Sequence, residues 1–401
     1  MIYKMKHFNL SLLAAALLPA ALLSSCGPKQ LSDKDILTLI YNQAGGENWR
    51  DSYKEGWLTA EDLNDWYGVE VNDEGRVTSL KIYDAKGVIP AEISGLTELE
   101  TLYLNLDNNE SDGDPVNCLP SSIGKLTNLR DLSLSVRVPC EVPPLDNLNF
   151  LEELDLYFNG VAYPENIGSR NLTELVLNGF NGPIPAWVYE MVWLKKLVIE
   201  PGKLESGIAP ELANLGDLEH LQIDYSQFIG SVDVPDSEFP SEAFFSLRNL
   251  KNVFIRGAAT SGTLPEEIDM PELKSLALVK LGLTGELPKA LGDLPKIETL
   301  KLYNNEFTGE IPVELCKATT LKTVWLEHNH LTGELPSEIG NLINLESLNV
   351  SYNELSGSIP AELAKCTKLG KGVFTDFSHN QFSEEIPAQV QSMENFSKFT
   401  F

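Results

Sequence analysis

The sequence predicts an α/β solenoid of about 13 coils, with a parallel sheet on its concave face and short helical or extended returns on its convex face. A frame of the form L-x-x-L-x-L-x-x-N recurs from residue 77 almost to the end. A G-x-[IVL]-P tetrad follows the better copies of this frame. The length of 401 residues also exceeds what one hydrophobic core usually organises, which favours a repeat array over a single small domain.

The frame explains how the coils stack. Alternate apolar residues in L-x-L lie on one side of a short strand, so positions 5 and 7 of the frame face the other way. One coil cannot bury its leucines alone, whereas stacked coils form a continuous core. The closing Asn can bind the backbone of the neighbouring coil. The frames begin at Val77, Leu99, Leu129, Leu151, Leu172, Leu194, Leu218, Leu250, Leu273, Ile297, Leu321 and Leu345, and a degenerate last copy ends at Asn380.

Leucine spacing, asparagine and the tetrad recur together, and in this combination the chain resembles the leucine-rich repeat family. The resemblance is to its 24-residue, plant-type class, which includes plant receptor ectodomains and bacterial lipoproteins, and it covers residues 77–390. It implies a solenoid, often with a second, smaller set of strands near the tetrads, and a role in recognition. The tetrads run from Gly87 to Pro90, Gly182 to Pro185, Gly262 to Pro265, Gly285 to Pro288, Gly309 to Pro312, Gly333 to Pro336 and Gly357 to Pro360.

Departures from the frame are concentrated before residue 297. There the Asn position holds other residues, so we expect a regular asparagine ladder only from residue 297 onward. Two long frames, 99–128 and 218–249, should carry loops at 105–117 and 230–240. The replacing residues are Ala85, Asp107, Arg137, Phe180, Gly202, Ser226, Ala258 and Leu281.

The N-terminus has the three parts of an export signal: basic Lys4 and Lys6, an apolar run at 8–23, and a small-residue exit. Leu23-Ser24-Ser25-Cys26 resembles a bacterial lipobox, which implies a lipid on Cys26 and a place in the cell envelope, at the outer membrane or cell surface. An ordinary secretory signal is the alternative. The expected organisation is a lipoprotein signal peptide at 1–25, a tether at 26–31, an N-terminal cap at 32–76, repeats at 77–390 and a C-terminal cap or tail at 391–401.

Both ends of an open solenoid need caps, because the terminal coils would otherwise expose leucines. Ser32 and Asp35 resemble a capping box that opens an apolar helix. The N-terminal segment resembles the cap of the same repeat class but lacks its cysteine pair, and we expect Trp49, Trp57 and Trp66 to take its place. The expected C-terminal plug consists of Phe374, Phe377, Phe382, Phe396 and Phe399.

Four cysteines lie beyond the leader. Cys118 and Cys140 occupy similar points of adjacent coils, which makes a disulfide feasible. Cys316 and Cys366 are two coils apart, near 10 Å by the strand spacing, which is beyond disulfide reach. We therefore expect Cys316 and Cys366 to be buried thiols.

Composition and motifs argue against several classes of function. Fifty-eight acidic residues against 30 basic ones give a net charge of −28, which disfavours a nucleic-acid partner. H-E-x-x-H, C-x-x-C, G-x-S-x-G and phosphate-binding loops are missing from the sequence, so we predict neither an enzyme nor a cofactor or metal site. The acidic stretch 107–114 leaves calcium as an alternative to a solvated loop. Contact with a membrane is expected only through the lipid anchor.

The concave face is the predicted ligand site, because leucine packing does not require aromatic residues there. Phe254, Tyr303, Trp325, His328 and Tyr352 should form an exposed cluster, unless the rings only pack against each other. We predict a non-catalytic module that binds a protein or peptide, with glycan binding or a structural role in the envelope as alternatives. The predicted contact residues are Tyr157, Glu200, Asp224, Phe254, Arg256, Tyr303, Trp325, Glu327, His328 and Tyr352.

Overall fold

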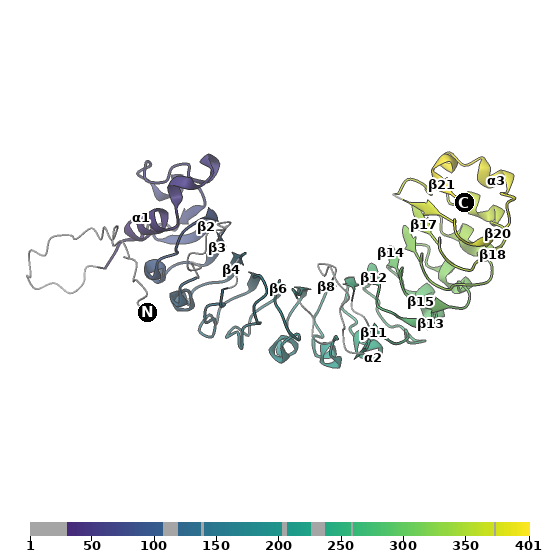
Figure 1. Ribbon diagram of the computed structural model, residues 1–401, viewed down its shortest axis with the longest axis horizontal. Coiled ribbons are helices and arrows are strands. Elements are labelled where there is room, and N and C mark those ends of the chain that lie inside the picture. The colour runs from purple at the N-terminus through teal and green to yellow at the C-terminus, as the bar shows by residue number, and fades with distance from the viewer. Residues whose placement is uncertain are drawn as a thin grey trace, which may run out of the picture.

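The computed structural model describes residues 30–106, 119–137, 140–202, 207–225, 237–257, 260–372 and 374–401. These residues form an arc, with helix α1 (Asp33–Gln43) at one end and helix α3 (Ala388–Gln391) at the other (Figure 1). Strands line the inner side of the arc and short helical turns its outer side. Among the helices of the described residues, none has the length and apolar character needed to span a bilayer.

In the described residues, the inner side is one sheet of 15 strands. Each of the thirteen frames contributes one strand, and these thirteen strands pair in parallel, which confirms the predicted fold class. Strand β1 (Val69–Val71) pairs antiparallel with the first of them, and β21 (Phe399–Thr400) pairs parallel with the last. The thirteen are β2 (Val77–Ala85), β3 (Thr101–Leu106), β4 (Asp131–Val136), β5 (Glu153–Tyr157), β6 (Glu174–Asn178), β7 (Lys196–Glu200), β8 (His220–Asp224), β10 (Asn252–Arg256), β12 (Ser275–Val279), β14 (Thr299–Lys301), β16 (Thr323–Trp325), β17 (Ser347–Asn349) and β19 (Thr375–Asp376).

Register aligns equivalent frame positions of neighbouring coils. Leu300 lies opposite Leu276 on one side and Val324 on the other, and each is at most 1% exposed. The leucines of successive coils thus form the continuous core that the frame predicts. The residues between them point to the concave face.

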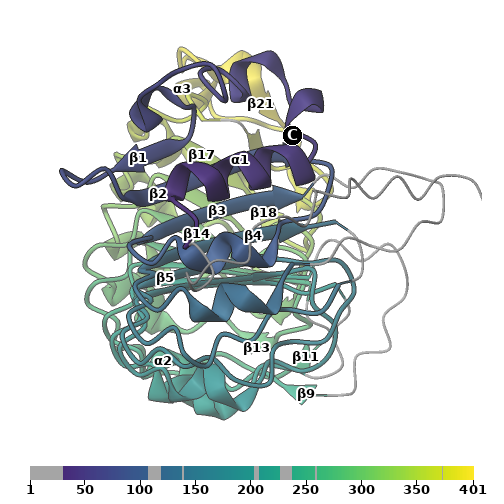
Figure 2. The ribbon, with the colours of Figure 1, turned by 90° about the vertical axis from the view of Figure 1, so that its left-hand side faces the viewer.

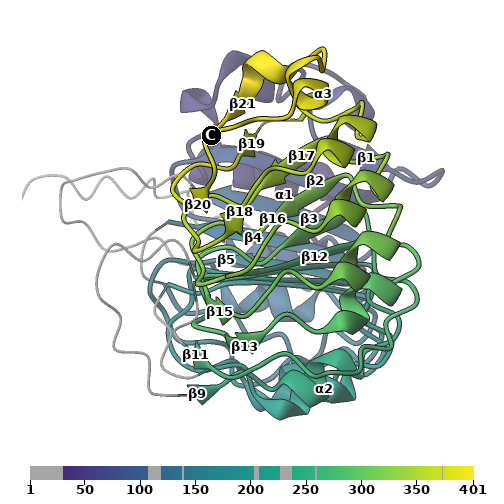
Figure 3. The same ribbon diagram turned by 90° about the vertical axis from the view of Figure 1, so that its right-hand side faces the viewer.

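The returns on the convex side are mostly short 3₁₀ helices that begin directly after a proline. Pro288, Pro312 and Pro336, with φ of −67°, −65° and −63°, each precede one. Figure 3 shows these helices stacked in a row along one flank. They are η4 (Ala91–Gly95), η5 (Ser121–Lys125), η6 (Ala186–Glu190), η7 (Pro210–Asn214), η8 (Lys289–Asp293), η9 (Val313–Lys317), η10 (Ser337–Asn341) and η11 (Ala361–Lys365), together with the α-helix α2 (Ser241–Phe245).

A second set of short strands lies on the flank opposite the helices (Figure 3). This is the smaller strand set that the resemblance implies. Gly309 and Gly333 of the tetrads adopt φ of 74° and 73° there, which only glycine adopts readily. The pairs are β9 (Ser237–Glu238) with β11 (Thr260–Ser261), β13 (Thr284–Glu286) with β15 (Glu306–Thr308), and β18 (Ser356–Gly357) with β20 (Gln381–Phe382).

The asparagine ladder forms where it is predicted. Asn329 is 6% exposed and donates from Nδ2 to the backbone oxygens of Leu302 (3.0 Å) and Leu326 (2.9 Å). Its Oδ1 accepts from the backbone N–H of Phe307 (3.1 Å). Earlier in the chain, at the equivalent position, the fully buried Phe180 stacks on Tyr163 instead. Apolar packing there replaces the amide bonds.

The N-terminal cap closes the first coil (Figure 2). Ser32 and Asp35 form the predicted capping box of α1. The rings of Trp49, Trp57 and Trp66 are buried, with centroids 5.2 Å and 5.0 Å apart along the series, so aromatic packing organises this segment. Three short helices connect α1 to β1: η1 (Gly46–Asn48), η2 (Asp51–Tyr53) and η3 (Leu63–Asp65).

The C-terminal plug forms around Phe377, whose ring contacts those of Phe382 and Phe399. It includes η12 (Phe396–Lys398) and β21. The assignment of Phe374 to this plug was wrong. Phe374 stands at position 3 of the last frame, faces the concave side and is 54% exposed.

Two of the cysteines are the buried thiols that the register predicts. Cys316 and Cys366 are free and buried, and burial raises the pKa of their thiols to about 12 and about 11. Cys140 is disulfide-bonded. Cys118, the partner considered for it, lies outside the described residues, as do Cys26 and the acidic stretch 107–114, for which calcium was the alternative to a solvated loop.

Candidate ligand-binding surface

The middle of the concave sheet contains a hollow of about 480 Å³. Its floor is formed by the position-5 side chains of five neighbouring strands, from β7 to β14. Three of these side chains are apolar and two are polar. Salt bridge Lys196–Glu174 (2.7 Å) lies on its border. We call this feature the central hollow, and its floor consists of Val198, Gln222, Phe254, Ala277 and Lys301.

A group of rings adjoins the central hollow toward the C-terminus. The centroid of Trp325 lies 6.0 Å from those of Tyr303 and Phe374, with interplanar angles of 57° and 67°. The Trp325 indole nitrogen donates to the Ser347 hydroxyl (2.9 Å), which fixes the ring. We call Tyr303, Trp325 and Phe374 the Trp325 cluster.

Lys301 joins the two features. Its side chain lines the central hollow, and its ammonium lies 3.9 Å from the centroid of the Trp325 ring. Burial lowers the pKa of this ammonium. The concave surface is therefore continuous from Val198 to Phe374.

Glu327 provides an acid beside the cluster. Burial raises the pKa of its carboxyl to about 7, with the Lys301 ammonium acting in the opposite direction. Its Oε2 is buried, and no described residue offers that atom a hydrogen bond. A ligand that brings a donor to Glu327 would remove this unsatisfied contact.

The other predicted charged residues lie on position 7 of β7 to β10. Glu200 is already bound from both sides, because Asn178 and Gln222 donate to it at 2.6 Å and 2.8 Å. Arg256 lies opposite Asp224 in the register and is exposed. Burial raises the pKa of Tyr303, and the charges of Arg256 and Asp224 act on it in opposite directions, Arg256 lowering this pKa and Asp224 raising it. Tyr157, 37% exposed, lies further along the same row on β5.

His328 and Tyr352 belong to a different group, so the predicted single cluster was wrong on this point. Their rings stack at 4.2 Å, and Tyr352 stacks on His379 at 3.9 Å. All three residues occupy position 8, with φ of 54° to 56°, because the chain turns here after the strand. The turn carries these side chains away from positions 5 and 7 to the rim of the sheet. Phe254 also has no ring contact with the Trp325 cluster within the described residues.

The sequence prediction did not include several residues of these groups as contacts: Val198, Gln222, Ala277 and Lys301 in the central hollow, Phe374 in the Trp325 cluster, and His379 at the rim. The repeat frame could have predicted Lys301 as a contact, because Lys301 and Trp325 both occupy position 5 of adjacent strands. A further aromatic group lies near the N-terminal cap, where Tyr83 contacts Tyr53 (5.0 Å) and Tyr103 (4.8 Å). Over the described ranges, no three His, Cys, Asp or Glu side chains group as metal ligands.

Residues 296–318, 320–342 and 344–366 match the family model described as Leucine Rich Repeat. No curated protein sequence matches the chain significantly.

Solved structures extend the similarity to most of the chain. A TDR receptor is 26% identical, with a TM-score of 0.62, over 80% of this chain and 58% of that one. The plant peptide hormone receptor RGFR1 in complex with RGF2 is 25% identical, with a TM-score of 0.60, over 82% and 59%. The Arabidopsis receptor kinase HAESA, in complex with the peptide hormone IDA and the co-receptor SERK1, is 25% identical, with a TM-score of 0.68, over 92% and 60%. The chain thus covers less than two thirds of each of these structures.

Proposed function

Because the chain belongs to the leucine-rich repeat family, in its plant-type class, we propose that it is a non-catalytic recognition module that binds a protein or peptide on its concave face. Two of the similar structures are receptors in complex with peptide hormones. Fold similarity alone does not transfer a ligand, so the proposal depends on the site.

The continuity of the central hollow with the Trp325 cluster carries the proposal. From β7 to β19 the surface crosses eight strands, or about 34 Å at 4.8 Å per strand. An extended peptide of about 10 residues, at 3.3 Å each, has this length. Phe254 and Trp325 would hold apolar side chains, while Glu327 would accept from a donor of the ligand.

A glycan is the weaker candidate for this surface. Sugar rings stack on flat, open aromatic faces, and the rings of the Trp325 cluster are tilted by 57° and 67°. The ammonium of Lys301 also covers one face of Trp325. This arrangement favours a peptide, whose side chains can fit between tilted rings.

A displayed library of random peptides, selected against the purified mature chain, tests the proposal. Selected peptides should lose at least about tenfold in affinity with Phe254→Ala or Trp325→Ala. Ile343→Ala is the matched control, since Ile343 is 56% exposed on the return after η10 and should leave binding unchanged. If both concave variants bind like wild type, the site is wrong; a glycan array that responds to the same variants would favour the carbohydrate alternative.

The proposed setting is the cell envelope, at the outer membrane or cell surface. Cleavage after residue 25 would leave a lipidated Cys26, and the tether at 26–31 would hold the solenoid away from the membrane. A single acyl chain gives weak binding, and several chains give stable anchoring. Metabolic labelling with an alkyne fatty acid should label wild type and not Cys26→Ser, while equal labelling would contradict the anchor. If the role is purely structural, deletion of the protein should cause a defect of the envelope. Expression of either Phe254→Ala or Trp325→Ala in the deletion strain should then correct that defect.

A further inference from the structure

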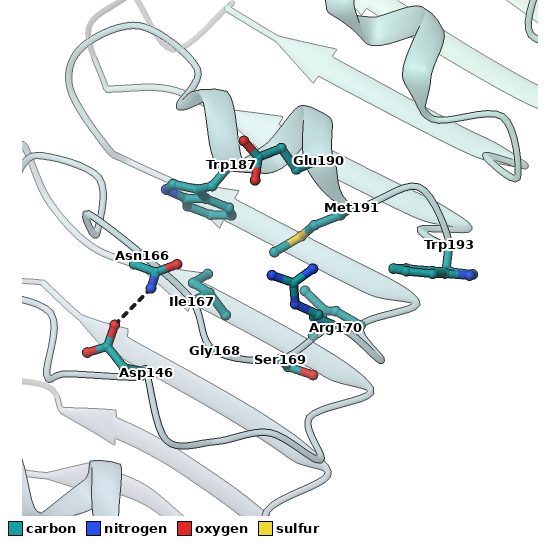
Figure 4. Close-up of a pocket in the computed structure, with 11 residues that line it drawn as sticks. Asp146, Asn166, Ile167, Gly168, Ser169, Arg170, Trp187, Glu190, Met191 and Trp193 are labelled. Carbon is teal, nitrogen blue, oxygen red and sulfur yellow. Dashed lines mark hydrogen bonds between the residues drawn. The ribbon is translucent and has the colours of Figure 1, made fainter.

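The convex side carries a second candidate site, separate from the concave face. Figure 4 shows this recess, which encloses about 290 Å³. That volume lies at the lower limit of ligand pockets, about 300–1,000 Å³, and suits a ligand of one or two small rings. We call it the convex recess, and its polar and aromatic walls are Asp146, Asn166, Arg170, Trp187, Glu190 and Trp193.

The recess forms where the row of convex helices is interrupted. The described residues of the returns after β4 and β5, at 140–152 and 158–173, contain no helix, whereas η5 precedes and η6 follows them. Gly168 lets these two returns approach closely, because a Cβ there would meet the Asp146 carbonyl oxygen at 1.9 Å. The missing helices leave a hollow with a buried floor that includes Ile167 and Met191.

Arg170 is the cation of the recess. Figure 4 shows its guanidinium projecting into the hollow between Trp187 and Trp193. Within the described part of the chain, this guanidinium has neither an ion pair nor a hydrogen bond. Asp146 lines the same hollow but accepts from Asn166 (3.1 Å) instead. An arginine without a carboxylate partner stands out in a chain with 58 acidic residues and 30 basic ones.

The two tryptophans of the recess differ in how firmly their rings are held and in how exposed they are. The indole nitrogen of Trp187 donates to the Pro164 carbonyl (2.9 Å), so this ring is fixed as a wall. Trp193 is 52% exposed and forms no ring contact among the described residues. Trp193 thus offers an open aromatic face at the mouth of the recess, in contrast to the covered face of Trp325.

The geometry points to a binding site for a sugar ring that carries a carboxylate, such as a hexuronate unit of an acidic glycan. The guanidinium of Arg170 would bind the carboxylate through two parallel hydrogen bonds. The apolar face of the ring would lie on Trp193, and its hydroxyls would donate to Glu190 and Asp146. An acidic peptide fits less well for two reasons. Its carboxylates would be repelled by Glu190 and Asp146, and it lacks the hydroxyl groups that could donate hydrogen bonds to them.

Isothermal titration calorimetry of the mature chain with digalacturonate tests this inference, with neutral digalactose and pentaglutamate as comparison ligands. Digalacturonate should bind saturably, and digalactose at least about tenfold more weakly, because it cannot pair with Arg170. Arg170→Met and Trp193→Ala should each weaken digalacturonate by a similar factor. Arg170→Lys should recover part of the loss, since it restores the charge without the planar fork.

Two controls keep this site separate from the concave one. Arg248→Met removes an exposed arginine from another convex return, where it pairs with Asp269 at 3.0 Å, and should leave digalacturonate binding unchanged. Phe254→Ala should also leave it unchanged. Equal binding of the acidic and neutral sugars, wild-type affinity in Arg170→Met or Trp193→Ala, equal binding of pentaglutamate, or no saturation by about 10 mM would each overturn the inference.

Discussion

The ammonium of Lys301 lies over the ring of Trp325, with Nζ 3.9 Å from the ring centroid. The two residues occupy position 5 of adjacent strands and are direct partners in the register. This contact holds the indole at the boundary between the central hollow and the Trp325 cluster. It therefore links the shape of the concave surface to one pair of side chains.

We expect a favourable coupling between Lys301 and Trp325. Unfolding in urea of wild type, Lys301→Met, Trp325→Leu and the double variant should give a coupling free energy of about 0.5–2 kcal/mol. Methionine keeps most of the apolar stem, so the coupling reports on the charge. The same cycle with Lys322 in place of Lys301 is the control, because Lys322 pairs with Glu298 at 2.6 Å. A coupling near zero for Lys301 would mean that the contact contributes nothing to stability.

Glu327 should make stability depend on pH. Its folded-state pKa, about 7, lies above its ordinary value of 4.5, so the folded chain binds this proton more tightly than the unfolded chain. The stabilising contribution is complete below pH 4.5 and is lost as the pH rises through 7. Glu327→Gln removes this dependence and should raise the free energy of unfolding by about 1–2 kcal/mol at pH 8, allowing for partial exposure, with little effect at pH 5.

Urea titrations of wild type and Glu327→Gln at several pH values between 5 and 8 measure this difference. Glu384→Gln, at an exposed position, is the control and should give a difference that does not change with pH. A constant difference for Glu327→Gln as well would show that its carboxyl titrates normally.

The asparagine ladder should be a large source of stability per residue. Asn329→Ala leaves the N–H of Phe307 without its buried acceptor. It also removes one hydrogen bond from each of the carbonyls of Leu302 and Leu326, which keep a second donor in Asn305 and Asn353. At about 1–3 kcal/mol for the unsatisfied N–H and about 0.5–1.5 kcal/mol for each of the two lost hydrogen bonds, with partial relaxation, we expect a loss of about 2–4 kcal/mol in urea unfolding. Asn344→Ala removes an exposed bond to the Thr319 carbonyl (2.9 Å) and should cost less than about 1 kcal/mol. Equal losses would indicate that burial of the ladder is unimportant.

The fold was predictable because the repeat constrains every coil in the same way. Leu276, Leu300 and Val324 meet in register, so one frame predicts the strands, their parallel pairing and the outward rows. The same logic predicts Trp325 and Tyr303 as neighbours. The division of the aromatic rings into separate groups could not be predicted from the sequence alone. His328 and Tyr352 stand at position 8, where the backbone turns with positive φ after the strand and moves their side chains to the rim.

Two further features escaped the pattern for physical reasons. Phe374 was assigned to the plug because the last frame is degenerate, and its concave position follows only from the pairing of β19 with β17. The convex recess forms because the described residues of two returns contain no helix. The repeat frame describes the strand of each coil and does not predict whether the return that follows is helical. Arg170 and Trp193 therefore come together only in the structure.

The N-terminal cap should depend on one buried carboxylate. Asp33 is 7% exposed, and its Oδ2 accepts from the backbone N–H of Val77 (2.8 Å) and from Arg76 Nε (3.0 Å), which ties α1 to the first repeat strand. Asp33→Ala leaves both donors without this acceptor, and we expect the cap to open more easily by about 2–3 kcal/mol, measured by hydrogen exchange of the Val77 amide. Ser32→Ala removes only the helix cap one residue away and should cost about 1 kcal/mol within α1, with the Val77 amide still protected. If the two variants expose Val77 equally, the cap is held by aromatic packing around Trp49 and Trp57, and the Asp33 contacts are secondary.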